Sequence, residues 1–147
     1  EDKIIESILA ISNFYVMRGT STQIVYDMIE KRQITIRSKA EFNAFYKACV
    51  DIRFDAKLAV YELIKDRVFR GEEGRFYVVV TPFLTKELYL TSLQVLASGT
   101  KLSVLLISDD LSEGSKKLKD GLRLAGVSIY QVMSDDEIDK ILSQEIA

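Results

Sequence analysis

The chain has 147 residues, of which 48% are hydrophobic and 29% are charged, and its formal net charge is −2. This length and balance predict one globular domain with a single sizeable core. The slight acidic excess provides no general attraction to nucleic acid, and no apolar run approaches the roughly 20 residues of a membrane-spanning helix. We therefore expect no nucleic-acid partner and no membrane span in this chain.

The N-terminus begins Glu1-Asp2-Lys3 and has neither an initiator Met nor the basic start and cleavage site of a signal peptide. We therefore expect the chain to be a piece of a longer protein or a processed product. Its only cysteine, Cys49, cannot form an internal disulfide. That usage fits a reducing compartment, and we expect a cytoplasmic location.

The sequence contains no histidine. Catalytic triads, histidine general bases and histidine-containing zinc sites are therefore excluded within this chain. A single cysteine also excludes zinc sites built from several thiolates, and iron–sulfur clusters. Carboxylate chemistry with Mg²⁺ or Ca²⁺, lysine chemistry, or no chemistry at all remains.

The first predicted elements are a helix and a hairpin. Apolar residues recur at helical spacing over residues 2–18, and Gly19 is placed to end that helix. Residues 23–29 and 34–36 then alternate in the manner of strands. About four polar residues separate them, which predicts an antiparallel hairpin.

Two further helices are predicted before the middle of the chain. Ser38-Lys39-Ala40-Glu41 is a capping box, in which Ser caps the helix and Glu reaches back to its N–H. An apolar stripe follows at helical spacing and is expected to face the core: Phe42, Phe45, Tyr46, Cys49 and Val50. Asp55 is placed to cap a second helix, whose inward residues are Val60, Leu63, Ile64 and Val68.

Strands and helices alternate regularly in the second half. The predicted strands are residues 76–80, 102–107 and 127–132, and the predicted helices between them are residues 85–98 and 112–125. Ser134-Asp135-Asp136-Glu137 has the pattern of a capping box and predicts a last helix ending near Ile146. Strands that start about 25 residues apart with a helix between each pair are typical of a parallel sheet. The sequence therefore predicts an α/β fold of one domain over residues 1–147.

Ligands bind at the carboxyl ends of the strands in open parallel sheets. At those ends the sequence has Thr81, then Ser108, Asp109 and Asp110, and then Met133 and Ser134. Adjacent carboxylates suit Mg²⁺, so Asp109, Asp110 and Thr81 are the candidate metal ligands. The competing interpretation is that both Asp residues precede the next helix, where its positive dipole end favours carboxylates. A magnesium site would also need a third carboxylate, and Thr81 offers only a hydroxyl.

No phosphate-binding loop or dinucleotide fingerprint is present. Four cations lie within the predicted helix 112–125: Lys116, Lys117, Lys119 and Arg123. They are interpreted as a solvated outer face, and a patch that binds a partner is the alternative.

The segment Tyr77-Val78-Val79-Val80-Thr81-Pro82-Phe83-Leu84-Thr85-Lys86-Glu87-Leu88 resembles a "hydrophobic strand, Thr-Pro-x-Leu-x-x-x-Leu" motif. That motif is typical of bacterial von Willebrand factor A-like proteins encoded near MoxR-type ATPases, the domain of unknown function 58. Residues 101–107, residues 122–130 and the opening residues 4–9 are also similar to this family. The resemblance covers most of the chain in order of elements.

The resemblance implies a three-layer von Willebrand A or Rossmann-like fold, with sheet order 3-2-1-4-5-6 and one antiparallel edge hairpin. The first central strand, and with it the Asp-x-Ser-x-Ser metal motif of such domains, has no counterpart in this sequence. Its absence would leave a gap beside strand 76–80. Either strand 24–28 pairs with a later strand, or a homodimer covers the edge.

Together these features predict a non-catalytic protein-interaction module without a complete metal-ion-dependent adhesion site. The resemblance implies a protein partner, with an AAA-type ATPase as the candidate. The alternative is a Mg²⁺-dependent phosphoryl-transfer or hydrolytic enzyme that uses Asp109 and Asp110. We expect no cofactor in the first case and Mg²⁺ in the second.

Overall fold

A computed structural model describes residues 2–27, 32–52, 59–69 and 76–143. The elements in chain order are α1 (Asp2–Val16), β1 (Thr22–Asp27), β2 (Arg32–Ile36), α2 (Lys39–Ala48), the 3₁₀ turn η1 (Cys49–Asp51), α3 (Val60–Val68), β3 (Phe76–Thr81), α4 (Lys86–Ala97), β4 (Lys101–Ile107), α5 (Glu113–Ala125), β5 (Ser128–Val132) and α6 (Ile138–Ile141). They form two compact units. Residues 59–135 are the parallel unit, and residues 1–58 with 136–147 are the hairpin unit.

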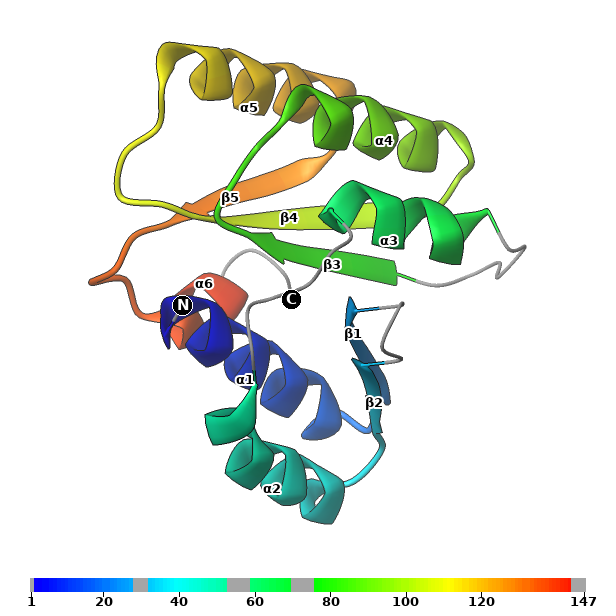
Figure 1. Ribbon diagram of the computed structural model, residues 1–147, viewed down its shortest axis with the longest axis vertical. Coiled ribbons are helices and arrows are strands. Elements are labelled where there is room, and N and C mark those ends of the chain that lie inside the picture. Colours follow the sequence, from blue (N-terminus) through cyan, green and yellow to red (C-terminus); the bar gives the residue numbers. More distant parts are fainter. Residues whose placement is uncertain (1, 28–31, 53–58, 70–75, 144–147) are drawn as a thin grey trace. The chain divides into compact units, whose positions relative to one another are not determined.

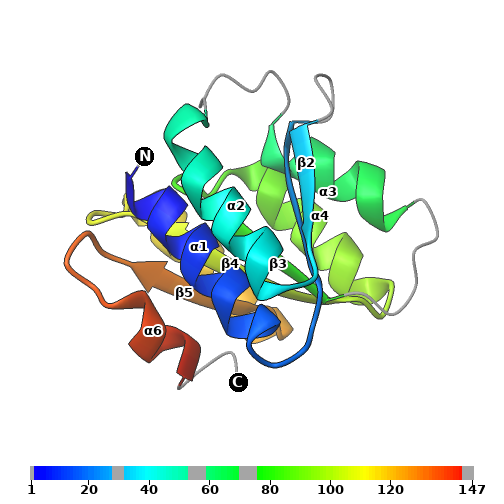
Figure 2. The ribbon, with the colours of Figure 1, turned by 90° about the horizontal axis from the view of Figure 1, so that it is seen from below.

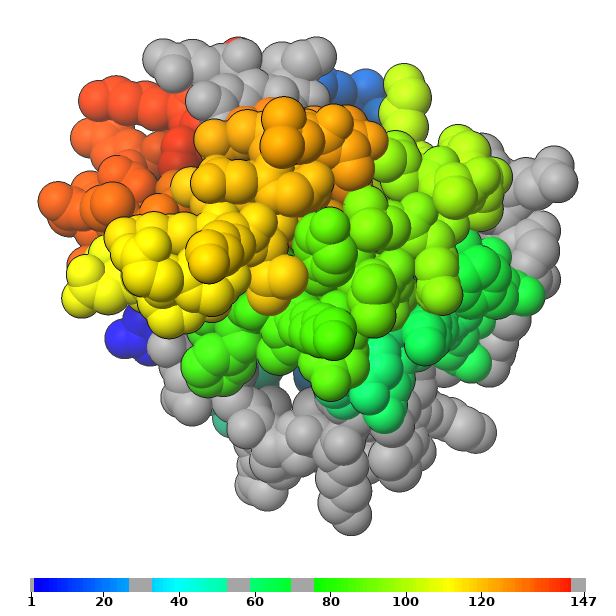
Figure 3. Space-filling view, turned by 90° about the horizontal axis from the view of Figure 1, so that it is seen from above, coloured from blue at the N-terminus to red at the C-terminus, as the bar shows by residue number. Residues whose placement is uncertain are grey.

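The parallel unit is a three-stranded sheet in the order β3-β4-β5, and both strand pairs are parallel. Val79 of β3 is in register with Val104 of β4, which is in register with Ile129 of β5. Figure 1 shows α3, α4 and α5 on the same side of this sheet. Seen from that side in Figure 3, the three helices lie next to one another. The predicted α/β, Rossmann-like class is confirmed.

The core of the parallel unit forms where these helices meet the sheet. Strand β4 contributes Leu102, Val104 and Leu106, all less than 5% exposed, and the helices contribute residues that include Leu88, Val95 and Leu122. Burying one such side chain stabilises a fold by about 1.5–3 kcal/mol. Ser103 and Leu105 point to the opposite face of β4 and are also buried. The continuous apolar run of the sequence therefore corresponds to a strand shielded on both faces.

Local polar contacts fix where the helices of the parallel unit begin and end. The Thr85 hydroxyl accepts a hydrogen bond from the Leu88 N–H (3.1 Å), and the Ser112 hydroxyl accepts one from the Ser115 N–H (3.1 Å). Such N-caps satisfy backbone donors that lack a partner in the first turn. Gly126 ends α5 with a φ of 99°, a backbone angle that favours glycine.

In its described residues, the hairpin unit combines an antiparallel pair of strands with helices α1, α2 and α6 and the 3₁₀ turn η1. Strand β1 pairs with β2, with Ile24 opposite Ile34. The buried residues Ile36, Phe42, Phe45 and Cys49 form its core, and residues of α1 pack against them. Helices α1 and α2 lie side by side in both Figure 1 and Figure 2, and α1 also contacts α6.

The predicted N-cap of α2 at Ser38 is confirmed, and the Glu41 side chain reaches back one residue further than expected. The Ser38 hydroxyl accepts a hydrogen bond from the Glu41 N–H (3.2 Å), and Glu41 Oε2 accepts one from the Arg37 N–H (2.8 Å). The Glu side chain therefore returns to the residue before the cap. The helix ends at Ala48, before the last residue of the predicted stripe, Val50.

Part of the predicted apolar stripe of α2 is wrong. Phe42, Phe45 and Cys49 are buried, but Tyr46 is 61% exposed and Val50 is 85% exposed. Val50 is exposed because α2 stops at Ala48 and Val50 lies in the 3₁₀ turn that follows. Tyr46 lies within α2, beside the face that Phe42 and Phe45 bury. The predicted cap Asp55 lies outside the described residues. The helix expected after it is confirmed as α3, with Leu63, Ile64 and Val68 buried.

The predicted capping box at Ser134 is also wrong. Helix α6 starts at Ile138, the residue before it is Glu137, and no side chain caps it. Ser134 makes a different contact, described below. The expected end of this helix near Ile146 lies outside the described residues.

The hairpin is present, but its place in the sheet differs from the expectation. Among the described residues, the hydrogen-bonded sheets are β1-β2 and β3-β4-β5, and they are separate. The hairpin is therefore not an edge of the parallel sheet, and β1 does not pair with a later strand. The order implied by the resemblance places a further strand between them, and the described residues contain no such strand through which backbone pairing could continue.

Candidate functional site

The carboxyl ends of β3, β4 and β5 meet at one edge of the parallel sheet, because the strands are parallel neighbours. Three connections leave this edge: residues 82–85, 108–112 and 133–135. All the metal ligands predicted from the sequence lie at or beside these connections. We refer to the three connections together as the carboxyl edge.

Thr81 is 5% exposed, and its hydroxyl holds the turn that follows β3. Thr81 Oγ1 accepts a hydrogen bond from the Phe83 N–H (3.3 Å) and donates one to the Phe83 carbonyl (3.2 Å). Short polar side chains after a strand commonly make such contacts with the backbone two residues on. The hydroxyl predicted as a metal ligand is thus already engaged in a local turn.

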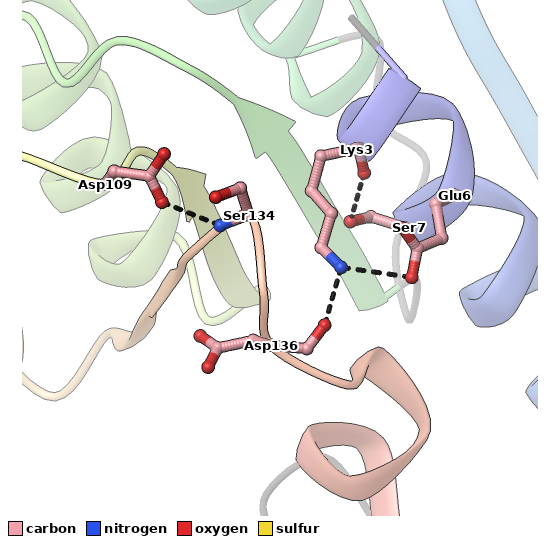
Figure 4. Close-up of polar contacts among 6 residues, drawn as sticks. All are labelled: Lys3, Glu6, Ser7, Asp109, Ser134 and Asp136. Carbon is pink, nitrogen blue, oxygen red and sulfur yellow. Dashed lines mark hydrogen bonds and ion pairs between the residues drawn. The ribbon is translucent and has the colours of Figure 1, made fainter.

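Asp109 ties two connections of the carboxyl edge together. Its Oδ1 accepts a hydrogen bond from the Ser134 N–H at 2.7 Å, and Figure 4 shows the carboxylate directed at that nitrogen. The Ser134 N–H, with a smaller contribution from the Ser134 hydroxyl, holds the pKa of the Asp109 carboxyl below its usual value. Both donors favour the ionised carboxylate. Asp109 therefore acts as an acceptor for the backbone that follows β5.

Further hydrogen bonds brace the same region around Ser108. Its N–H donates to the Val132 carbonyl (3.0 Å), and its carbonyl accepts from Gln131 Nε2 (3.0 Å). The Ser108 hydroxyl donates to the Asp110 carbonyl (2.5 Å). These contacts extend the pairing of β4 and β5 past the ends of the strands, so both connections leave the sheet from a fixed position.

The structure places Asp109 and Asp110 side by side on an exposed connection, as predicted. It does not add a third acidic ligand to them. Within the described ranges, no group of three or more His, Cys, Asp or Glu side chains is arranged to hold a metal ion. The carboxyl edge therefore offers two carboxylates, one of which already accepts a backbone hydrogen bond.

The predicted basic cluster lies on α5. Lys116 and Lys117 are exposed, and Lys116 Nζ lies 3.3 Å from Glu113 Oε1. Arg123 donates from Nη2 to the Ile129 carbonyl (3.1 Å), so it joins α5 to β5. Lys116, Lys117 and Arg123 are exposed and Lys119 is half-buried, in agreement with the predicted solvated face, and Arg123 also makes this contact with β5.

Sequence reasoning missed a second set of polar contacts, in the hairpin unit. Lys3 Nζ donates to the Asp136 carbonyl (2.5 Å) and lies 3.1 Å from Glu6 Oε1, and its side chain is only 14% exposed. The Ser7 hydroxyl donates to the Lys3 carbonyl (2.7 Å), as Figure 4 shows. The cation thereby joins α1 to the segment before α6. No local pattern signals this contact, because its partners are 133 residues apart in sequence.

Sequence reasoning also missed that two large apolar side chains are exposed at the carboxyl edge. Phe83 is 73% exposed and Met133 is 41% exposed. Their positions directly after Pro82 and after strand β5 were the available signal. Met133 was named only as a strand-end residue, and Phe83 only within the segment that resembles the family motif.

In comparisons with known proteins, no family model and no curated protein matches the chain. In the part of the chain that the structure describes, none of the helices has the length and hydropathy to cross a bilayer.

Proposed function

We propose that the chain is a non-catalytic protein-interaction module of the von Willebrand A-like type, without a complete metal-ion-dependent adhesion site. The observation that carries this proposal is the use of the polar groups at the carboxyl edge. Thr81 holds the Phe83 backbone, and Asp109 holds the Ser134 backbone. Because these side chains bind the backbone, they hold the connections in place and are less available to bind a substrate. This favours an interaction surface over an active site.

The sequence resemblance supports the von Willebrand A-like assignment within this proposal. By this resemblance, β3, β4 and β5 correspond to the last three strands of the sheet order 3-2-1-4-5-6. Those three strands are neighbours in that order, as β3, β4 and β5 are here. A protein encoded near MoxR-type ATPases has such an ATPase as its first candidate partner, so an AAA-type ATPase is the partner that we propose.

The proposed partnership can be tested by sedimentation velocity with a purified MoxR-type ATPase in the presence of ATP or ADP. We expect a faster-sedimenting complex that contains both proteins. Separate sedimentation under both nucleotide conditions would exclude this partner.

The alternative function is a Mg²⁺-dependent phosphoryl-transfer or hydrolytic enzyme. One observation favours it: the two adjacent carboxylates lie at the edge where parallel sheets bind ligands, and the lowered pKa of Asp109 keeps that group ionised. Coordination through Asp109 Oδ1 would compete with the Ser134 N–H for the same oxygen. The proposal of an interaction module needs no such rearrangement.

Thermal unfolding with added Mg²⁺ or Mn²⁺ separates the two functions. A metal that binds only the folded state, present at 100 times its dissociation constant, adds about 2.7 kcal/mol to the free energy of unfolding. If the chain is an interaction module, we expect neither ion to change its melting temperature. A rise that is lost in Asp110→Asn, but kept in Asp120→Asn on α5, would instead support the metal-dependent enzyme.

A further inference from the structure

The carboxyl edge displays apolar surface at both of its ends. Phe83 follows β3 and is 73% exposed, and Met133 follows β5 and is 41% exposed. Strand β4 lies between β3 and β5, and neighbouring strands are roughly 4.8 Å apart, so the two strand ends are about 10 Å apart. A single extended segment or one face of a helix covers such a distance. Large exposed apolar side chains gathered on one face are typical of protein-binding surfaces.

Phe83 is displayed from a backbone that is held in place. Its N–H and its carbonyl both bond to the buried Thr81 hydroxyl, Pro82 precedes it, and the next residue, Leu84, is 6% exposed. The turn is therefore anchored on both sides of the exposed ring. A side chain whose backbone is already ordered loses less conformational entropy on binding, which favours its use as an anchor. Aromatic anchors of this kind contribute much of the affinity at protein interfaces.

The connections of the carboxyl edge carry acidic charges. Its connections contain Asp109, Asp110 and Asp135, which are all exposed, and they contain no Lys or Arg. Beside these connections, the exposed Lys86 begins α4 and is followed by Glu87, and Lys116 on α5 has an ion pair with Glu113. The flanking cations are thus each accompanied by an acidic residue, and Asp109, Asp110 and Asp135 remain as an acidic excess. Charge complementarity therefore selects a cationic partner over an acidic or neutral one.

From these observations, and resting on the proposed interaction function, we propose that the carboxyl edge binds a protein segment that presents an Arg or Lys next to a large apolar side chain. The apolar side chain packs on Phe83 and Met133. The cation binds the carboxylates of Asp109 and Asp110. Arg adds a further attraction, because its guanidinium also binds the face of an aromatic ring such as Phe83.

Binding of fluorescent peptides, followed by anisotropy, tests this proposal on the full chain. Three peptide sets of equal length combine Leu with Arg, with Glu or with Ser. We expect the Leu–Arg set to bind and the other two sets to bind at least tenfold more weakly. Raising the salt concentration weakens the Leu–Arg complex, since exposed charges are screened.

Matched variants locate the bound peptide. Phe83→Ser and Asp110→Asn are each expected to weaken Leu–Arg binding by about tenfold or more. The control variants Leu124→Ser and Asp120→Asn remove an apolar group and a charge from α5. They are expected to leave binding unchanged. Phe83 and Leu124 are both well exposed, so both Ser variants are expected to keep the melting temperature of the parent chain.

Several results would overturn the proposal: no binding by any peptide set, a preference for the Leu–Glu set, or equal weakening by the α5 variants. Sedimentation of the chain alone can give one further result that would overturn the proposal. A dimer that Phe83→Ser dissociates would identify a second copy as the occupant. The two proposals also fail separately. An ATPase complex that persists in Phe83→Ser rejects this surface alone, whereas peptide binding at the carboxyl edge without an ATPase complex rejects that partner alone.

Discussion

The parallel unit and the hairpin unit bury their strands in different ways. In β4, consecutive side chains from Leu102 to Leu106 are all buried, so neither face of the strand meets solvent. In the hairpin, apolar Ile34 and Ile36 alternate with polar Gln33 and Thr35, and the apolar side packs with the core of its own unit. A continuous apolar run therefore indicates a strand that is buried on both faces, whereas alternation indicates a strand that is buried on one face only.

The largest expected effect comes from breaking the core of the parallel unit. Leu122→Ala removes a side chain with no exposed surface, and we expect it to lower the free energy of unfolding by about 2–5 kcal/mol. Leu124→Ala, two residues along the same helix, changes a side chain that is 90% exposed and is expected to stay within about 0.5 kcal/mol. Urea unfolding followed by circular dichroism measures both. Equal losses would show that α5 does not bury Leu122 against the sheet.

The core of the hairpin unit can be examined through its cysteine. Cys49 is 7% exposed and packs with Phe42 and Phe45, and desolvation by burial raises the pKa of its thiol. The raised pKa leaves less reactive thiolate at neutral pH. We expect alkylation by iodoacetamide to be at least about tenfold slower in the native chain than in urea, a difference of about 1.4 kcal/mol. Native and unfolded chains that react at the same rate would contradict this packing.

Each unit contains a serine that lies three residues before a Glu, and the two serines have different roles. Ser38→Ala removes a real N-cap of α2 and is expected to cost about 1 kcal/mol of stability. Ser134 caps no helix, and the Ser134→Ala variant keeps the backbone N–H that bonds to Asp109. A smaller loss of stability is therefore expected. Chemical denaturation of both variants gives the ranking. A larger loss for Ser134→Ala would show that this serine has a capping role after all.

The smallest effect concerns the pH dependence of the Asp109 contact. The Ser134 N–H lowers the pKa of Asp109 in the folded chain, so the contact stabilises the fold above the unfolded pKa of about 3.9 and is lost as pH falls through the lower folded value. The amide resonance of Ser134, followed by NMR, is expected to titrate with a midpoint below about 3.9. Asp109→Asn should abolish that titration. A midpoint at or above the usual value would contradict the hydrogen bond.

Sequence reasoning predicted most elements of the fold because their signals are local. The starts of α2, α4 and α5 depend on hydrogen bonds between residues three apart, at Ser38, Thr85 and Ser112. The apolar runs of β3 and β4 likewise identify their strands without knowledge of any partner. Contacts of short sequence separation are visible in the order of residues alone.

The wrong predictions arose where a distant partner competes with a local pattern. Ser134 has the same Ser-x-x-Glu spacing as Ser38, but Asp109, 25 residues away, accepts its N–H. The pattern cannot report that competitor, because the two residues meet only when β4 and β5 pair. The same reason applies to the hairpin, whose neighbours depend on which strands the folded chain contains.

The position of the candidate site was predicted from the sequence, but the hydrogen-bonding roles of its side chains were not. The sequence located the carboxyl edge correctly through Thr81 and Asp109. What it could not give was the direction of each side chain, and so whether an oxygen faces a ligand or the chain's own backbone. For Phe83, no local pattern indicates whether the side chain is exposed, and it follows the Thr81 turn at 73% exposure.

The contact between Lys3 and the Asp136 carbonyl has a consequence for the order in which the chain can fold during synthesis. The strands of the parallel unit pair across about 25 residues, as Val79 does with Val104, so each pairing closes a short loop. The Lys3 contact closes a loop of 133 residues, which costs more chain entropy than either strand pairing. Because the strands of the parallel unit lie between Lys3 and Asp136 in the sequence, they can pair before the Lys3 contact forms.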